Sequence, residues 1–414
     1  MNWPSNAWSA GPFGLDAAKG STVPPVRRVL AVAHHVTAAA RLADVVPLLE
    51  SDRRVAVAYT ASPASLFTGG LEEFLRGLGG LVLPWQQAVR TRFDLAVAAS
   101  HGMLENLHAP VLTVPHGAGQ GKLLGRRPGF GPPAARSVTS LVRERLVVRG
   151  RVVPSSLVLA HERHRELLGR ECPEALAVSV VGGDPCLDRL VASLPHRTAY
   201  RRALGAGDGG RLVLVTSTWG RDSLFGRDRD LLLRIAAELA HDGNRVVTVL
   251  HPHFWAWYGR RQVVSWYADC MRMGVRLLPP EEGWRAAVVA ADQVIGDHGS
   301  VSGYSAALGV PVVLGAFPEE SVAPGSHIAR LGAVAPRMEW DRPIGPQLDA
   351  AAHAFTPGVH AAFREELSSE PGRAARLIRG EMYRLMRLPE RGDPPEAVPV
   401  PLPHPITWDG RRAA

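Results

Sequence analysis

Short apolar runs alternate with amphipathic stretches from residue 26 onward. Residues 26–35 and 53–62 are rich in valine and alanine, which favours buried strands, and residues 37–51 between them repeat apolar positions with helical spacing. A strand, a helix and a second strand joined by short connections are typical of a parallel sheet covered by helices. The pattern therefore predicts an α/β fold.

The same pattern begins again near Gly209. A strand at 211–219, a helix at 228–242 and a strand at 244–253 follow it, and a turn at 182–185 precedes it. Two successive halves of this kind predict two Rossmann-like, doubly wound domains facing a cleft. The predicted boundaries are a flexible N-terminal arm at 1–25, an N-terminal domain at 26–190, a C-terminal domain at 209–345, helices crossing back at 350–388 and a mobile Pro-rich tail at 389–414.

Composition narrows the class of protein. The 414 residues are 46% hydrophobic and 21% charged, which favours globular packing over disorder. Cys172, Cys186 and Cys270 are scattered, so neither a disulfide framework nor a zinc site is predicted. The first residues lack the basic start and apolar core of a secretory signal, and no apolar run reaches about 18 residues. We expect a cytoplasmic protein.

The chain is strongly basic, with a formal net charge of +8. Such a charge favours polyanionic partners, namely phosphorylated substrates, anionic lipid headgroups or nucleic acid. The arginines are spread along the whole chain and accompany no nucleic-acid-binding motif, so we expect no nucleic acid partner. The charge is also compatible with peripheral binding to the inner face of an anionic membrane.

Loops after strands carry the first candidate chemistry, because ligands of doubly wound sheets gather beyond the carboxyl ends of the strands. In VLTVPHGAGQGK, an apolar run ends in His116, and Gly117 and two further glycines precede Lys122. Lys122 and Lys19 are the only lysines of the chain. The glycines would let backbone amides approach an anion, and His116 could accept a proton from an attacking hydroxyl. A simple glycine turn capped by a histidine is the alternative.

Two further loops could contact phosphate. After the apolar run ending at residue 250, His251 and His253 flank a proline and could donate to a pyrophosphate; packing is the alternative, and no nearby carboxylate or cysteine completes a metal site. In GDHGSVSG, residues 297–303 are expected to open a helix whose amides and hydroxyls would seat a phosphate, although Ser300 or Ser302 could simply cap that helix. A fourth loop could meet a nucleotide through Ser217, Thr218 and Arg221 or be merely solvated.

The segments HGAGQGK, LHPH and GDHGS, in this order, resemble the CDP-glycerol glycerophosphotransferase family, which builds teichoic-acid-like polymers on a fold of the GT-B type. The resemblance covers roughly residues 27–330. It implies an acceptor-side N-terminal domain and a nucleotide-donor C-terminal domain. It also implies that His116 is the general base, and that His253 and Ser300 hold the diphosphate of a CDP-linked donor.

The resemblance implies a transferase that moves a glycerophosphate, another polyol phosphate or a sugar from a nucleotide-diphosphate donor to a hydroxyl acceptor, in cell-envelope or glycopolymer biosynthesis. No firm cofactor follows, and a divalent cation is compatible with the reaction but not required. The alternatives are a UDP-sugar glycosyltransferase or 2-epimerase of the same fold, and a non-catalytic nucleotide-binding regulatory protein. The candidate residues are His116 and His253 as catalytic, Gly117, Lys122, His251, Asp297, Gly299, Ser300 and Ser302 at the donor phosphates, and Ser217, Thr218 and Arg221 in the nucleotide-side loop; no metal ligand is predicted.

Overall fold

The computed structural model divides the chain into two compact units. Unit 1 comprises residues 1–116, 140–186 and 369–397, and unit 2 comprises residues 117–139, 187–368 and 398–414. The structure describes residues 8, 9, 13, 17–123, 140–207, 209–240, 244–393 and 395–407. Most of the predicted N-terminal arm, and residues 408–414 of the predicted tail, lie outside these described residues.

Unit 1 is built on a seven-stranded parallel sheet in the order β3-β2-β1-β4-β5-β8-β9. The strand order reverses beside β1, which pairs with β2 on one side and with β4 on the other, as in a doubly wound fold. The strands are β1 (Arg27–Ala33), β2 (Val55–Ala61), β3 (Leu81–Leu83), β4 (Leu95–Ala98), β5 (Val111–Thr113), β8 (Ser156–Leu159) and β9 (Ser179–Val181).

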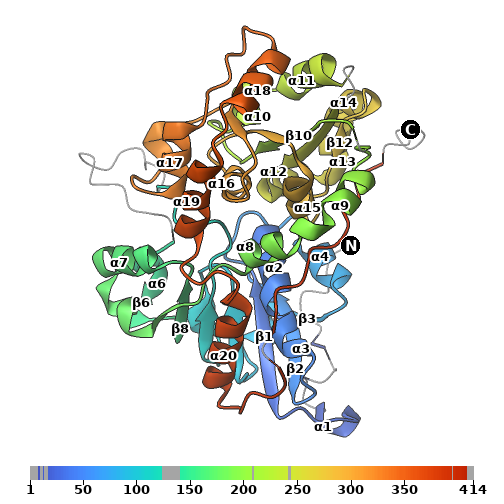
Figure 1. The fold of residues 1–414 in the computed structure, drawn as a ribbon. Coiled ribbons are helices and arrows are strands. Elements are labelled where there is room, and N and C mark those ends of the chain that lie inside the picture. Colours follow the sequence, from blue (N-terminus) through green and yellow to red (C-terminus); the bar gives the residue numbers. More distant parts are fainter. Residues whose placement is uncertain are drawn as a thin grey trace, which may run out of the picture. The chain divides into compact units, whose positions relative to one another are not determined.

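Both faces of this sheet are buried. Along β1, Val29 and Ala31 join one apolar cluster while Leu30 and Val32 join another on the opposite face, because successive side chains of a strand point to opposite sides. Helix α20 packs against α2 and α3 (Figure 1). The helices and short strands are α1 (Ala17–Gly20), α2 (Val36–Val45), α3 (Pro47–Glu50), α4 (Leu71–Gly77), α5 (Trp85–Ala88), η1 (Leu104–Asn106), α6 (Arg143–Leu146), β6 (Val147–Val148), β7 (Arg151–Val152), α7 (Glu162–Glu171), η2 (Pro173–Val178) and α20 (Ala374–Met386).

Unit 2 repeats the architecture on a five-stranded parallel sheet in the order β12-β11-β10-β13-β14. Its strands are β10 (Leu212–Ser217), β11 (Arg245–Leu250), β12 (Arg276–Leu277), β13 (Gln293–Gly296) and β14 (Val312–Leu314). Its helices are η3 (Leu194–His196), α9 (Arg197–Ala203), α10 (Leu224–Arg227), α11 (Leu231–Leu239), α12 (Pro252–Tyr258), α13 (Arg260–Trp266), α14 (Ala268–Arg272), α15 (Trp284–Ala290), α16 (Ser300–Ala307), η4 (Glu319–Ser321), α17 (His327–Val334), α18 (Ile344–His353) and α19 (Pro357–Leu367). Each unit thus has a Rossmann-like α/β architecture, which confirms the predicted fold class.

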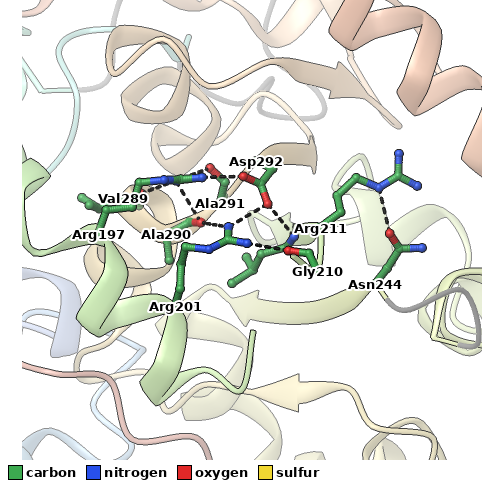
Figure 2. A network of polar contacts seen from close by, with 10 residues as sticks. Arg197, Arg201, Gly210, Arg211, Asn244, Val289, Ala290, Ala291 and Asp292 are labelled. Atoms are coloured by element: carbon green, nitrogen blue, oxygen red, sulfur yellow. Dashed lines mark hydrogen bonds and ion pairs between the residues drawn. The ribbon is translucent and has the colours of Figure 1, made fainter. Parts of the chain in front are cut away.

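A network of arginines fixes the amino-terminal edge of this second sheet (Figure 2). Arg201 bonds Asp292 at 2.7 Å, Arg197 pairs with the same carboxylate, and Asp292 accepts the backbone N–H of Leu212 at 2.7 Å. Arg197 also donates to the carbonyls of 289, 290 and 291, at the C-terminal end of α15. Cations at a helix C-terminus satisfy carbonyls that have no partner within the helix. The network therefore locks α9 and α15 to the start of β10, at the edge opposite the strand ends that carry the candidate residues.

The chain passes from unit 1 to unit 2 just after the predicted turn at 182–185. Arg41 bonds Asp184 at 2.9 Å, and both side chains are buried. Gly183 has φ +76°, and a Cβ there would lie 3.1 Å from Glu370. Because only glycine fits such a left-handed, crowded position, the turn is fixed within unit 1. Helix α8 (Pro185–Ala192) then begins at the boundary.

The C-terminal segments are divided between the units. Helices α18 and α19 belong to unit 2, and α20 belongs to unit 1. Two residues of the Pro-rich segment form hydrogen bonds with other residues of unit 2. The Val400 carbonyl accepts the Tyr200 hydroxyl at 2.7 Å, and the Ile406 N–H donates to the Leu277 carbonyl at 2.8 Å. Val400 and Ile406 of the predicted tail thus have defined hydrogen bonds. Within the described ranges, no helix combines the length and apolar character that crossing a bilayer demands.

Candidate functional site

Three adjacent strands of unit 2 end together and bring three of the predicted loops into contact. Strand β10 lies between β11 and β13, so Thr218, His251 and Asp297 follow neighbouring strand ends. The His251 N–H donates to the Ser217 carbonyl at 3.1 Å, and the Thr218 N–H donates to Asp297 at 2.9 Å. The carboxyl edge of this sheet therefore gathers residues that lie up to 80 positions apart in sequence.

Asp297 organises these loops. Its carboxylate is fully buried and accepts backbone N–H groups of Thr218 at 2.9 Å, Leu224 at 3.0 Å and Gly299 at 2.9 Å. Burial raises its pKa, whereas the three amides and the charge of Lys122 oppose that rise. An anionic side chain whose oxygens are already occupied is a poor partner for phosphate. This placement favours a positioning role over the direct phosphate contact predicted from the sequence.

Lys122 lies in unit 2, beside Asp297. Its Nζ donates to Thr218 Oγ1 at 2.8 Å, and its backbone forms an isolated antiparallel bridge with Val322. The neighbouring Leu123 N–H donates to Ser321 at 3.1 Å. The ammonium is half-buried, which lowers its pKa, and the Asp297 charge counteracts this lowering. The lysine that follows His116 in sequence is thus a component of the second sheet's edge.

Gly121 allows the segment around Lys122 to pack closely on its neighbours in unit 2. A Cβ on Gly121 would approach Ile328 Cγ1 to 2.8 Å, which is closer than real Cβ atoms come. The Gly121 carbonyl accepts the Ala323 N–H at 3.0 Å. Gly117 lies near Ser300, since a Cβ on Gly117 would be 3.1 Å from Ser300 Oγ. The glycines predicted to bring backbone close to an anion therefore bring it close to α17 and to the start of α16.

The two predicted serines of α16 have different surroundings. Ser300 is exposed at the first position of the helix, and Gly299, without a side-chain cap, is the N-cap residue. Ser302 is fully buried, and a Cβ on Gly296 would lie 2.3 Å from its Oγ. Ser300 is accessible to a ligand, whereas the position of Ser302 favours packing against β13.

The HPH motif has a local structural explanation. His251 is the N-cap of α12, and its Nδ1 accepts the His253 N–H at 3.1 Å. Pro252 occupies the first helical position, where its missing N–H costs nothing. The two imidazole rings are 4.6 Å apart. His251 therefore serves first as a cap. Both histidines are half-buried, and both ring nitrogens of His253 are covered by the protein.

Two residues of this cluster escaped the sequence reasoning. Trp219 follows Thr218, keeps 44% of its surface exposed, and lies with its ring centroid 5.1 Å from that of His253. His298 is buried, and burial together with the charges of Lys122 and Arg227 lowers its pKa to about 3, so its imidazole is neutral. A tryptophan in a polar loop was the available signal for the first. The charge neighbours of His298 come from other loops, so nothing local marked it.

The remaining members of the nucleotide-side loop also differ in exposure. Ser217 is buried, and its Oγ accepts the Phe225 N–H at 3.2 Å. Arg221 is exposed in the turn that wraps Gly226, where a Cβ would lie 2.1 Å from the Gly220 carbonyl. Ser217 thus stabilises the loop, while Arg221 is accessible to an anionic ligand.

In unit 1, histidines follow three adjacent strands. His34 and His35 follow β1, His101 follows β4, and His116 follows β5. His34 is buried, and its Nε2 bonds the Gly102 carbonyl at 2.9 Å. His35 caps α2 by accepting the Ala38 N–H, and its ring lies 5.1 Å from that of His116 in an edge-to-face arrangement. Of these four histidines, the sequence reasoning identified only His116.

The hydrogen bond of His116 determines which nitrogen can act as a base. Its Nδ1 lies 2.8 Å from the Ala99 carbonyl, which can only accept, so Nδ1 carries the proton and Nε2 keeps a lone pair. Desolvation by the surrounding protein lowers the pKa of His116. The hydrogen bond to Ala99 opposes this lowering, and the positive charge of Arg41 adds to it. Because His116 is exposed, solvent limits the size of this effect. The neutral, Nδ1-protonated form is the one that general-base chemistry requires.

The loop after β4, between His101 and His116, contains strained backbone. Gly102 has φ +111°, and Met103, which has a side chain, has φ +60°. Burial lowers the pKa of the adjacent His101 to about 3, and His34 and Arg145 act in the same direction. Backbone strain of this kind gathers at functional sites, since it persists only where surrounding contacts impose it. The strand ends of unit 1 therefore form a second candidate site, centred on His116.

The sequence and the fold were compared with those of known proteins. No protein-family model matches the chain, and no curated protein matches its sequence significantly. A histidine variant of the wall teichoic acid polymerase TagF superposes with a TM-score of 0.59 at 13% identity, over 87% of this chain and 89% of that one. Another structure of TagF gives a TM-score of 0.55 at 14% identity, over 88% of this chain and 90% of that one.

The chain has the GT-B fold. A UDP-GlcNAc 2-epimerase from Methanocaldococcus jannaschii is also similar, with a TM-score of 0.50 at 11% identity over 86% of this chain and 99% of that one. At identities this low the likeness shows the fold alone. These neighbours are enzymes, and one TagF structure was obtained after a soak with CDPG. The fold predicted from the three short motifs is thereby confirmed, while the roles of individual residues remain predictions.

Proposed function

We propose that the protein is a transferase that moves a polyol phosphate or a sugar from a nucleotide-diphosphate donor to a hydroxyl acceptor. The observation that carries this proposal is the position of Lys122. The chain passes into unit 2 after His116, and there the Lys122 ammonium donates a hydrogen bond to Thr218, beside Asp297. Five residues of the chain separate His116, the candidate base, from Lys122 at the candidate phosphate site. The boundary between the two units falls between His116 and Gly117.

The donor phosphates would bind at the start of α16. The first amides of a helix have no partner within it and carry the positive end of the helix dipole, so they favour an anion. Ser300 adds an exposed hydroxyl, and Lys122 adds a positive charge held by Thr218. As the donor bond breaks, negative charge grows on the leaving nucleotide. Fixed donors aimed at that charge stabilise the transition state more than the bound donor.

His116 would accept the proton of the acceptor hydroxyl at Nε2. In polyol-phosphate transfer, the acceptor oxygen forms a bond to the outer phosphorus while the bond between that phosphorus and the bridging oxygen breaks. The electron pair of the broken bond leaves with the nucleoside monophosphate, which Lys122 and the α16 amides would neutralise. His253 would hold the diphosphate next to them. Asp297 would keep the Thr218 and Gly299 loops in register.

We propose a CDP-linked donor, most simply CDP-glycerol, and an acceptor in cell-envelope or glycopolymer biosynthesis. Support comes from the three motifs and from the fold shared with TagF. The experiment is a thermal-shift screen of the full chain with CDP-glycerol, CDP-ribitol, UDP-glucose and UDP-GlcNAc, because a ligand that binds only the folded state raises the melting temperature. A shift with the CDP compounds supports the CDP-linked donor, and shifts with UDP-sugars alone favour the alternative of a UDP-sugar glycosyltransferase or 2-epimerase.

Turnover separates an enzyme from a non-catalytic binding protein. A donor identified in the screen is incubated with the protein and a panel of polyol and glycan acceptors, and release of the nucleotide is measured. His116→Ala is expected to bind the donor as the native protein does and to lose transfer. Donor binding without nucleotide release from the native protein across the panel would contradict the transferase and leave the binding protein.

We propose peripheral contact with an anionic membrane through an exposed patch of unit 2, and a location at the inner face of that membrane. Trp257, Tyr258 and Trp266 are 63%, 46% and 50% exposed, and Arg260 and Arg261 lie among them. Aromatic side chains favour the headgroup region, and arginines pair with lipid phosphates. Sedimentation with liposomes containing anionic lipid should fall when Trp257 and Arg261 are both replaced by alanine. Equal sedimentation of this variant and the native protein would contradict the patch.

A further inference from the structure

The loop after β10 presents an aromatic surface beside the candidate phosphate site. Trp219 lies between Thr218, which binds Lys122, and Gly220, whose φ of +97° turns the chain away. The centroid of its indole is 5.1 Å from that of His253 and 6.4 Å from that of His251. Both imidazoles thus lie beside the indole, and 44% of the residue is still exposed.

This exposure is notable because of its position. Single exposed aromatic residues are common on protein surfaces, but an exposed indole beside a candidate phosphate site offers a flat face on which a ring can stack. The immediately preceding residue, Thr218, carries both the Lys122 contact and a backbone bond to Asp297. A molecule with its phosphates at Lys122 would have its next group within reach of the indole.

We propose that Trp219 is the platform on which the nucleobase of the donor stacks. The inference rests on the proposed function, because it assumes that a nucleotide binds at Lys122 and α16, and it adds the part of the site that holds the base. A nucleotide joins a flat aromatic ring to a charged phosphate through one ribose. The loop offers the matching pair in adjacent residues, an exposed indole and a threonine that anchors a cation.

Stacking has a property that the experiment can use. Every base has a π-face, so a stacking platform increases affinity without choosing between bases. Loss of the indole should therefore weaken CDP and UDP by the same factor. It should leave inorganic pyrophosphate, which has no base, unaffected. The choice of cytosine or uracil would be made by other groups.

The test is isothermal titration of the full-length protein with CDP, UDP and inorganic pyrophosphate. Trp219→Ala should weaken both nucleotides about 10-fold to 100-fold and leave pyrophosphate binding unchanged. Trp219→Phe keeps an aromatic face and should recover most of the loss. Trp8→Ala is the matched control, since Trp8 is 43% exposed and belongs to unit 1. A circular dichroism melt of each variant confirms that it is folded.

The outcomes separate this inference from the proposed function. If Trp219→Ala binds CDP as tightly as the native protein, Trp219 is not the platform, although the nucleotide site stands. If the variant loses pyrophosphate by the same factor as CDP, the indole serves the phosphate site by shielding His253, and the stacking role is wrong. If the native protein binds none of the three compounds, the proposed function fails and takes this inference with it.

Discussion

Lys122 Nζ donates a 2.8 Å hydrogen bond to Thr218 Oγ1, across 96 positions of sequence. Together with the bridge between Lys122 and Val322, this bond holds the segment that follows β5 in sequence, which belongs to unit 2, at the edge of the second sheet. It places a cation next to the buried Asp297, at the strand ends where ligands of this fold gather.

Removal of the lysine charge should weaken the binding of the donor. Lys122→Ala is expected to raise the Kd for a nucleotide diphosphate about 10-fold to 100-fold, because a hydrogen bond to a charged group contributes about 1.5–3 kcal/mol. Isothermal titration measures the effect. Lys19→Ala, which removes the other lysine, an exposed residue of unit 1, should bind as the native protein does. Equal affinity of the two variants would exclude Lys122 from the phosphate site.

His116 should give the reaction a characteristic pH dependence. The pKa of its imidazole lies below the ordinary 6.5, so kcat/KM should fall as the pH drops through a value lower than 6.5, where protonation of Nε2 removes the base. His116→Ala should reduce kcat about 10²-fold to 10⁴-fold, the usual contribution of general-base catalysis. It should also abolish the acid limb. His196→Ala, at an exposed histidine of unit 2, should retain both. An unchanged acid limb in His116→Ala would assign the base elsewhere.

Asp297 should affect the stability of unit 2 more than the charge of the site. Asp297→Asn replaces one accepting oxygen with an NH₂ group that faces backbone N–H donors, and should lower the free energy of unfolding by about 1.5–3 kcal/mol. Urea denaturation followed by circular dichroism measures the change. Asp341→Asn, at an exposed position of the same unit, should leave the midpoint in place. A native-like midpoint combined with tighter donor binding would contradict the positioning role.

Asp52 should contribute stability that depends on pH. Its carboxylate bonds Arg54 at 2.6 Å and Tyr383 of α20 at 2.8 Å, and the Arg54 bond chiefly holds its pKa below the ordinary value. A lowered pKa stabilises the folded state above the unfolded value of about 3.9, and this contribution is lost as the pH falls through and below that value. Asp52→Asn should therefore melt at a lower temperature than the native protein at pH 7. The difference should shrink as the pH is lowered below about 4, and a difference independent of pH would contradict this assignment.

The two-domain fold could be predicted because its signal is local. Strands such as β1 and β10 are apolar on both faces, and the helices between strands repeat every three or four positions, so each element is visible in a short window. The residues that follow strands could be selected for the same reason. His116, Thr218, His251 and Asp297 all stand at strand ends, as predicted.

Other parts of the site could not be predicted from the sequence. His34 and His101 join His116 only because the strand order places β4 between β1 and β5. Ser302 and Ser300 are two positions apart, yet one is buried against Gly296 and the other is exposed, which depends on how α16 packs on β13. The polar loop around Trp219 is visible in the sequence, but only the folded chain places the His253 ring beside the indole.

The sequence by itself determined the succession of strands and helices and the loops in which polar residues gather, because hydrophobic periodicity is written into neighbouring residues. The tertiary structure decided which loops meet. It assigned Lys122 to unit 2, occupied the oxygens of Asp297 with backbone amides and gave His251 the role of a cap. Such contacts join residues far apart in sequence or depend on backbone geometry, and only the folded chain brings them together.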